Sequence, residues 1–565
     1  VNRIVRRLDG IPLAIELAAA RLRVLSPDQI AARLEDRFRL LTGGSRTALP
    51  RQQTLRALID WSYDFLDKKE QQLLRRLSVF AGGWTLEAAE WVGCDDPGER
   101  RPGPGGVATE GIERHEIIDL LTNLVNKSLV SMEEKDGLLR FGFLETIRQY
   151  ARDKLFEAGE QGTVRRRHMD YFRKLIDEEK LVDMASFIAE LTLDEALDTR
   201  AATDWSQRLL ADFDNIRTGI EWAIENDPDA AVIMVNNLSP NFFIFGSGQD
   251  FLRWLAASRE RMESLPAASP DVMKSRDLHL AASYFNEGTV LMSMGLYRQA
   301  VERFDPVIDR LRENGNEKTP LIASLLSMRA SANQFLNPPQ GMADAAESAA
   351  ILGELGMRNF RAIPLAILAA GYARQRELDR AGQLEQEAMD SLSRDTASFS
   401  AMMATFLLAM LERMIGHYDQ ARKALERAST IARNIGHGPI LRALTAETGH
   451  VERLQGNEEA AAAIFGNVIR EFQEYGHRSA VANLLEVCGF FAIHNGKFSR
   501  ACILLGAAEA IREQSRSVMA PFEREEYLRE MATLRENLPE EPLAAEWSRG
   551  RKMTLDQAVD FALAG

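Results

Sequence analysis

The six residues Gly416-His417-Tyr418-Asp419-Gln420-Ala421 belong to a pattern that recurs along the second half of the chain. Copies of it begin, in order, at Gly295, Arg376, Gly416, Gly456 and Gly496. The last four follow one another at a constant spacing of forty residues, and a weaker copy spans 341–346. A turn that returns at a fixed period of this order is typical of stacked helix pairs. We therefore expect residues 276–540 to form an array of antiparallel helices.

The residue types in this pattern suit a tight bend between two helices. Glycine at the first position permits the unusual backbone angles of such a bend. The third position holds an aromatic ring in three copies, which can pack beneath the turn. The sixth position holds alanine, which lets two helices approach closely, at 300, 381, 421, 461 and 501. Packing alone explains these positions, and the register places Ala421 in a helix contact and Arg422 on the exposed side.

The pattern resembles the turn of tetratricopeptide (TPR) repeats, although forty residues is longer than the usual TPR period. Stacked pairs of this kind form a superhelix with an inner groove, and such grooves bind peptides, proteins or small ligands. The resemblance therefore implies a protein or small-molecule effector as the partner of this array.

The first residues of the chain predict an amphipathic helix. Gly10 permits a turn, Pro12 suits the first helical position, and Leu13, Leu17 and Ala20 follow at helical spacing. The stretch resembles the Gly-x-Pro motif of the STAND class of signalling ATPases, which includes the NB-ARC switches. The resemblance implies that Gly10 and Pro12 lie on the adenine side of bound ATP or ADP in the full-length protein.

A phosphate-binding loop of the form Gly-x-x-x-x-Gly-Lys-Ser/Thr does not occur in the sequence. We therefore interpret residues 1–46 as a helical lid domain that follows an NTPase core lying upstream in the same polypeptide. For this chain alone we expect no cofactor.

Residues 47–160 predict a winged-helix domain. Helical segments are followed by two short strands, 129–132 and 139–143, joined at Asp136-Gly137, which is a strong hairpin signal. The segment Trp61-Ser62-Tyr63-Asp64 resembles an element that precedes the winged helix of NB-ARC proteins. The segment that begins Phe143-Leu144-Glu145 resembles their Met-His-Asp motif, with Leu144 in the place of the histidine.

The candidate recognition helix, residues 116–126, is poor in cations. Asn123, Asn126 and Lys127 suit DNA, but acidic residues stand at 113, 116 and 119, and the whole chain carries a net charge of −14. Because binding to DNA phosphates requires cations, we expect an intramolecular docking role and no direct DNA binding.

The remaining segments are assigned as a helical linker region at 161–275 and a C-terminal tail at 541–565. Residues 212–217 and 505–512 resemble parts of large LuxR-type bacterial regulators, in many of which a helix-turn-helix follows. This chain stops at Gly565 without one, and the full-length protein could form oligomers.

Several functional classes find no support in the sequence. The cysteines Cys94, Cys488 and Cys502 form no metal pattern or disulfide spacing, which favours a cytoplasmic protein. The apolar run at 242–245 is too short to span a membrane. No nucleophile–base pair, paired-carboxylate motif or metal set stands out, so we expect no enzyme, no catalytic residues and no metal.

The fold expected is mainly all-α: a small helical domain, a winged helix with a β-hairpin, and a TPR-like α-solenoid superhelix. The function expected is that of a regulatory fragment of a STAND-type signalling protein, in which the superhelix binds an effector. Its output domain could bind DNA or could be a cyclase or kinase. The alternative is a TPR scaffold without nucleotide-dependent switching, and nucleotide binding by a longer chain with the upstream core would separate the two.

Overall fold

The computed structural model describes most of the chain from Pro50 onward. The described residues are Ile15, Ala19, Gln29, 50–95, 111–135, 138–179, 208–239, 248–266 and 269–564, the last range without 314–317, 393–398, 435–437, 475, 516, 518 and 520. Gly10 and Pro12 lie outside these residues, as does nearly all of the lid domain expected at 1–46. The chain divides into two compact units, one of residues 1–178 with 211–227 and one of 179–210 with 228–565. This division does not decide the domain boundaries expected above, which stay predictions.

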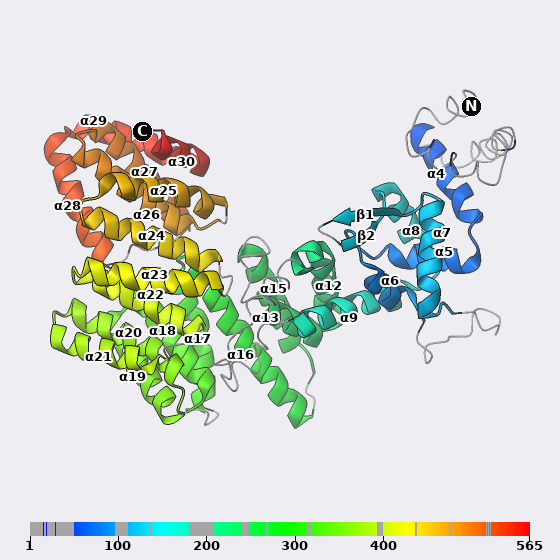
Figure 1. The fold of residues 1–565 in the computed structure, drawn as a ribbon, viewed down its shortest axis with the longest axis horizontal. Coiled ribbons are helices and arrows are strands. Elements are labelled where there is room, and N and C mark those ends of the chain that lie inside the picture. Colours follow the sequence, from blue (N-terminus) through cyan, green and yellow to red (C-terminus); the bar gives the residue numbers. More distant parts are fainter. Residues whose placement is uncertain are drawn as a thin grey trace. The chain divides into compact units, whose positions relative to one another are not determined.

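The first unit combines helices with one hairpin. Its described elements are α4 (Pro50–Asp64), α5 (Lys68–Leu77), α6 (Leu86–Gly93), the 3-10 helix η2 (Arg114–Glu116), α7 (Ile117–Asn126), β1 (Ser131–Lys135), β2 (Leu138–Gly142), α8 (Glu145–Glu157), α9 (Gln161–Glu179) and α12 (Phe213–Asn226) (Figure 1). The strands are antiparallel, with Lys135 opposite Leu138, and Trp84 forms an isolated antiparallel bridge to Phe141. The helices α5, α6 and α7 with this hairpin have the arrangement of a winged helix.

The hairpin is displaced by two residues from the strand expected at 129–132. Ser128 adopts a left-handed φ of 56°, and the amide of Leu129 donates to the carbonyl of Leu124 at 3.0 Å. The end of α7 therefore occupies Leu129 before the strand begins at Ser131. The buried side chains of Leu129 and Val130 join the core from this bend.

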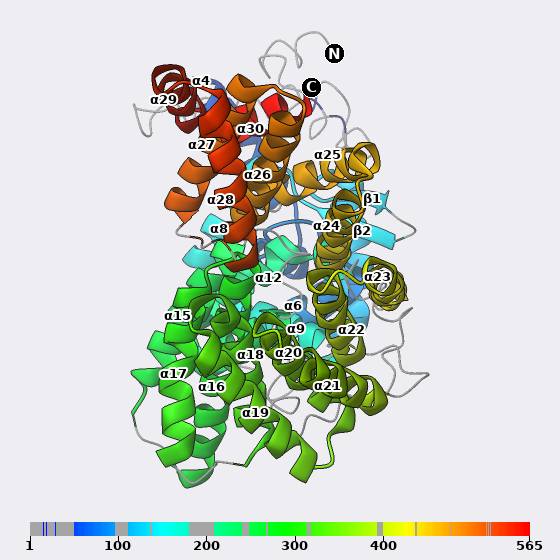
Figure 2. The ribbon, with the colours of Figure 1, turned by 90° about the vertical axis from the view of Figure 1, so that its left-hand side faces the viewer.

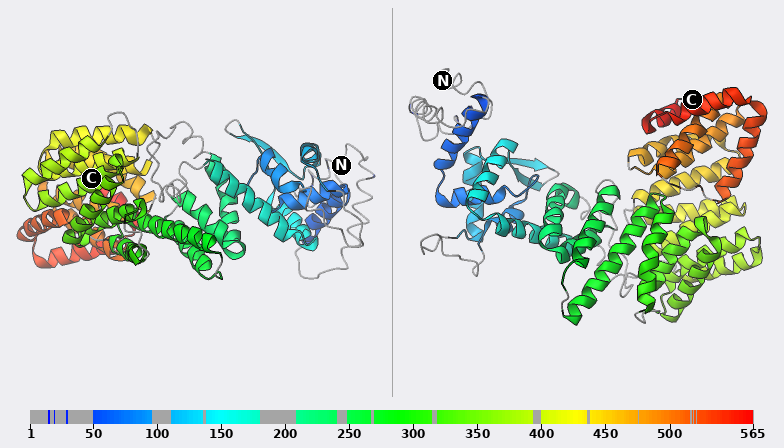
Figure 3. Two further views of the ribbon diagram at one scale, coloured as in Figure 1. Left: turned by 90° about the horizontal axis from the view of Figure 1, so that it is seen from below. Right: turned by 180° about the vertical axis from the view of Figure 1, so that it is seen from behind.

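The second unit is a helical solenoid. Its described helices are α13 (Pro228–Leu238), α15 (Gly248–Glu263), α16 (Pro270–Ser293), α17 (Tyr297–Glu313), α18 (Pro320–Leu336), α19 (Pro338–Glu354), α20 (Arg358–Arg374), α21 (Leu378–Ser391), α22 (Phe399–Met414), α23 (Tyr418–Asn434), α24 (Gly438–Leu454), α25 (Glu458–Glu474), α26 (Arg478–His494), α27 (Phe498–Ser515), α28 (Pro521–Asn537), α29 (Glu540–Arg551) and α30 (Leu555–Leu563). From α16 to α27 they form six antiparallel pairs, which Figure 3 shows from two further sides. The mainly α-helical, TPR-like fold expected from the sequence is confirmed.

The backbone confirms each strong copy of the turn pattern. All five turn residues have positive φ: Gly295 (75°), Arg376 (64°), Gly416 (86°), Gly456 (86°) and Gly496 (67°). Arg376 thus adopts a left-handed conformation that side chains with a Cβ rarely accept. The alanines five residues later are buried, with at most 3% exposure.

The prediction of a turn at the weak copy, residues 341–346, is wrong. Gly341 lies inside α19, and a Cβ there would come within 3.1 Å of the carbonyl oxygen of Ala330 on α18. It occupies the place that alanine holds in the other pairs, 41 residues after Ala300 and 40 before Ala381. The turn itself comes earlier, at Asn337, where φ is −148° and no glycine is required.

The expected exposure of Arg422 also needs correction. Its side chain is 39% exposed, and its Nη2 lies 2.9 Å from a carboxylate oxygen of Glu452 on the next pair. The long side chain of Arg422 therefore reaches across to α24. Lys423, the following residue, is exposed.

Close contacts within the pairs recur in the same register. A Cβ added to Gly288 would lie 2.2 Å from the ring of Phe304, and one added to Gly449 would lie 2.5 Å from the ring of Phe465. In both pairs the large side chain follows the glycine by sixteen residues. The missing side chain on one helix therefore makes the space that the aromatic ring of its partner fills.

The last helices continue the packed core. Ala558 and Val559 of α30 are buried in one cluster with residues of α25, α26 and α27. On α29, a Cβ at Gly550 would lie 2.0 Å from the carbonyl oxygen of Ile503, so its backbone lies directly against α27. Residues 541–563 thus cover the end of the array.

Candidate functional site

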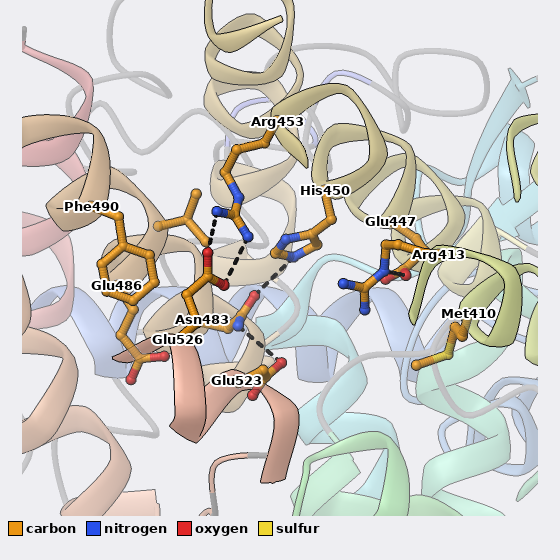
Figure 4. Close-up of a pocket in the computed structure, with 11 residues that line it drawn as sticks. Met410, Arg413, Glu447, His450, Arg453, Asn483, Glu486, Phe490, Glu523 and Glu526 are labelled. Atoms are coloured by element: carbon orange, nitrogen blue, oxygen red, sulfur yellow. Dashed lines mark hydrogen bonds and ion pairs between the residues drawn. The ribbon is translucent and has the colours of Figure 1, made fainter. Parts of the chain in front are cut away.

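A polar cavity lies on the face formed by the first helices of successive pairs. It holds about 60 Å³, and a more open hollow of about 370 Å³ adjoins it through their shared residue Glu486. The cavity is lined from α22, α24, α26 and α28 by Met410, Arg413, Glu447, His450, Arg453, Asn483, Glu486, Val487, Phe490, Glu523 and Glu526 (Figure 4). The hollow is lined by Glu486, Leu505, Glu509, Arg512, Glu513, Ser517, Met519 and Tyr527.

The forty-residue register brings these side chains together. Met410, His450 and Phe490 stand forty residues apart and hold the same place on three successive helices. The same spacing relates Arg413 to Arg453. It also relates Asn483 to Glu523 and Glu486 to Glu526, so α28 continues the register of α26. Because equivalent positions face the same way in stacked repeats, a single face collects them.

One chain of hydrogen bonds crosses three helices of the cavity. The Nδ2 of Asn483 donates to a carboxylate oxygen of Glu523 at 3.0 Å, which leaves its Oδ1 to accept from Nε2 of His450 at 3.2 Å (Figure 4). Burial, and then the guanidinium groups of Arg413 and Arg453, hold the pKa of His450 well below its usual value. His450 is therefore neutral near pH 7 and carries its proton on Nε2.

Ion pairs hold the arginines of the cavity. Arg453 donates to Glu526 at 2.9 Å, and Arg413 donates to Glu447. Arg512, on α27, donates to Glu486 at 2.6 and 2.8 Å. Removal of a partner from such buried pairs leaves an unpaired charge, which is strongly destabilising.

The walls of the two hollows carry more negative than positive charge. They include six glutamates, against which stand the four arginines Arg413, Arg453, Arg512 and Arg551. Arg551, from α29, is shared between Glu509 and Glu513. The guanidinium group of Arg512 lies 3.9 Å from the carboxylate of Glu523. With His450 neutral, the site has an excess of two negative charges and could attract a positively charged ligand.

No residue of this groove was predicted from the sequence. The predicted nucleotide-side residues, Gly10 and Pro12, lie outside the described residues, so the structure does not bring them to any site. The signal that could have located the groove was present: Arg413 and Arg453 stand one repeat period apart on the first helices of two successive pairs. Among the described residues, no group of three or more His, Cys, Asp or Glu side chains could hold a metal ion.

Lys127, a cation expected beside the candidate recognition helix α7, is engaged in an ion pair. The ammonium group of Lys127, just beyond the end of α7, donates to the buried carboxylate of Glu70. Glu70 also accepts from the amide of Asp67 at 2.9 Å and so belongs to the capping box of α5. Lys127 therefore has a structural partner. Within the described parts of the chain, no helix is long and apolar enough to cross a membrane.

Comparison with known proteins gives relatives but no family. No protein-family model matches the sequence. The chain is 38% identical over 283 residues to a protein of Mycobacterium tuberculosis (strain H37Rv) named "Putative HTH-type transcriptional regulator", a match that covers 49% of this chain and 28% of that protein. An uncharacterized protein of the same strain is 41% identical over 174 residues, which cover 31% of this chain and 41% of that protein. The matches thus span less than half the length of either relative.

Two solved structures show distant similarity. One is a STAND protein with a tetratricopeptide repeat sensor from Pyrococcus horikoshii, with a TM-score of 0.37, 14% identity, and coverage of 94% of this chain and 74% of that one. The other is a Rap protein complexed with Competence and Sporulation Factor, with a TM-score of 0.36, 13% identity, and coverage of 60% and 99%.

Proposed function

We propose that this chain is the sensor part of a transcriptional regulator and that its solenoid binds a positively charged effector, such as a basic peptide segment. The named relative, similar over about half of the chain, supports the regulatory role. The observation that carries the binding role is the ladder of charged side chains that the repeat register gathers around one cavity.

The charge of the groove favours a cation. Each arginine of the walls already has a carboxylate partner, so an anionic ligand would have to displace one. Glu523 is 27% exposed, and Arg512 lies 3.9 Å from it. A guanidinium or ammonium group of an effector could reach this partly exposed carboxylate and pair with it. Charge-assisted hydrogen bonds of this kind are the stronger class.

The experiment is a fluorescence-anisotropy titration with a labelled arginine-rich peptide and a glutamate-rich peptide of equal length. We expect the arginine-rich peptide to bind more tightly, and Glu523→Gln to weaken its binding about fivefold, since this change keeps the acceptor for Asn483 and removes the charge. The control is Glu459→Gln, at an exposed position on α25. Equal effects of the two variants would mean that the peptide binds the acidic surface in general, and the proposed site would then be wrong.

We further propose that the full-length protein uses ATP or ADP on the side of Gly10 and Pro12, and that this chain acts by binding rather than by catalysis. The support is the sequence resemblance of those residues. Nucleotide binding by a longer chain that includes the upstream core, lost on Pro12→Ala, would test it. If the longer chain bound no nucleotide, the simpler scaffold function would replace this part of the proposal.

A further inference from the structure

The first turn of the array differs from the others in its surroundings. Gly416, Gly456 and Gly496 are exposed, and a Cβ added to any of them would meet nothing within 4 Å. Gly295, at the same place in the first pair, is buried. The backbone angles are alike, with φ of 75° at Gly295 and 86° at Gly456. Something outside the first pair therefore covers this turn.

The covering residues come from the sixth pair and from the segment that follows it. The hydroxyl of Ser479, on α26, donates to the backbone carbonyl of Met294 at 3.1 Å, across 185 residues of sequence. A Cβ on Gly295 would lie 2.6 Å from the Cβ of Ser479 and 3.8 Å from that of Ser517. Glycine is thus needed here for close approach as well as for its positive φ. Figure 2 shows the corresponding path, in which the pairs run from α17 through α21, α23 and α25 and return to α27 and α28.

The same turn stands beside the polar groove. Tyr297 stacks on Phe335 with 4.6 Å between ring centroids, and its phenol lies near Glu523 and Arg512. Burial, followed by the charge of Glu523, raises the pKa of Tyr297 to about 12. Ser517, which approaches Gly295, is also a wall residue of the open hollow. The contact between the first and sixth pairs therefore lies next to the proposed effector site.

We propose that the contact of Met294 and Gly295 with Ser479 is a latch that holds the first and sixth pairs together and restricts the entry of an effector from the open hollow into the cavity. The cavity holds about 60 Å³, which is room for a few water molecules but not for a peptide side chain with its backbone. The hydrogen bond from Ser479 to Met294 and the close approach of Ser479 to Gly295 join the pairs here. This inference rests on the proposed function for the identity of the site, but the latch can be tested without any effector.

The test compares two matched variants. Gly295→Asn and Gly456→Asn place the same side chain at the same kind of turn, and Asn tolerates positive φ better than most residues. Only the first meets Ser479. Each is combined with Met410→Cys in the wall of the cavity, and the modification rate of Cys at 410 by a bulky polyethylene-glycol maleimide is measured by peptide mass spectrometry on the full chain. We expect Gly295→Asn to raise this rate about fivefold, equivalent to the loss of one hydrogen bond of about 1 kcal/mol.

Internal controls separate opening from unfolding. Cys502 is fully buried, so its modification reports general unfolding. The milder change Ser479→Ala removes the hydrogen bond without adding bulk and should raise the rate at 410 in the same direction. If neither variant raises that rate while Cys502 stays protected, or if Gly456→Asn raises it as much as Gly295→Asn, the latch is refuted.

Peptide titration separates a failure of the latch proposal from a failure of the proposed ligand. If the latch closes the site, Gly295→Asn should bind the arginine-rich peptide about fivefold more tightly than the parent chain, because more of the protein is in the open state. Faster modification with unchanged peptide affinity would show that the contact does not control entry, which overturns the proposal. If no form binds the peptide, the proposed ligand is wrong, and the modification rates alone decide whether the latch exists.

Discussion

Replacement of Ala421 by leucine tests the register on which the array rests. The alanine is fully buried on α23, in a core cluster with residues of α20, α21, α22 and α24. A leucine adds three carbon atoms where no space exists for them. Overpacking of a well-packed core typically costs about 1–3 kcal/mol. At this chain size each kcal/mol lowers the melting temperature by about 2 °C, so we expect a decrease of about 2–6 °C.

The matched control is Lys423→Leu, two residues later on the same helix. Lys423 is exposed, and surface changes usually stay within about 0.5 kcal/mol. Arg422 does not serve as this control, because its pairing with Glu452 links two repeats. Melting followed by circular dichroism measures the difference, and hydrogen exchange locates it. Exchange should accelerate in α22, α23 and α24, since each repeat is stabilised by its neighbours. If Ala421→Leu and Lys423→Leu melted alike, the assigned register would be wrong.

Four further outcomes are expected. Arg376→Gly should raise the free energy of unfolding by about 1 kcal/mol, because glycine adopts the positive φ of this position without strain. Gly416→Ala should lower it by a similar amount, and melting curves measure both changes. Burial, with a hydrogen bond to Glu412, raises the pKa of Glu385 to about 8, above its unfolded value. Because the folded state then binds more protons than the unfolded state, the free energy of unfolding should fall as the pH rises from about 4.5 to 8. Glu385→Gln should therefore raise the melting temperature more at pH 8 than at pH 5, and equal gains at both would contradict this. The chain should not shift DNA in a sequence-specific manner at physiological salt, which a gel-shift assay with competitor DNA checks. It should release no phosphate from ATP; steady release that a chelator abolishes would refute this.

The sequence determined the elements that depend on near neighbours. A turn with positive φ is encoded within six residues, so even Arg376 could be placed, although the residue is not glycine. The hairpin followed from Asp136-Gly137 between two short strands, with an error of two residues because the end of α7 takes up Leu129. The weak copy at 341–346 failed because Gly341 serves helix approach, and a glycine looks the same in sequence whether it makes a turn or a close contact.

The tertiary structure alone decided the groove and the latch. His450, Asn483 and Glu523 come from three helices, and their hydrogen bonds depend on the small rotation between successive pairs. That rotation accumulates over six pairs until Ser479 reaches the carbonyl of Met294. Local sequence patterns do not determine this accumulated rotation, because the rotation between two successive pairs is set by the packing of whole helix faces. The sequence could therefore predict that an inner face exists, but the curvature of the array decided which charges meet on it and where it closes.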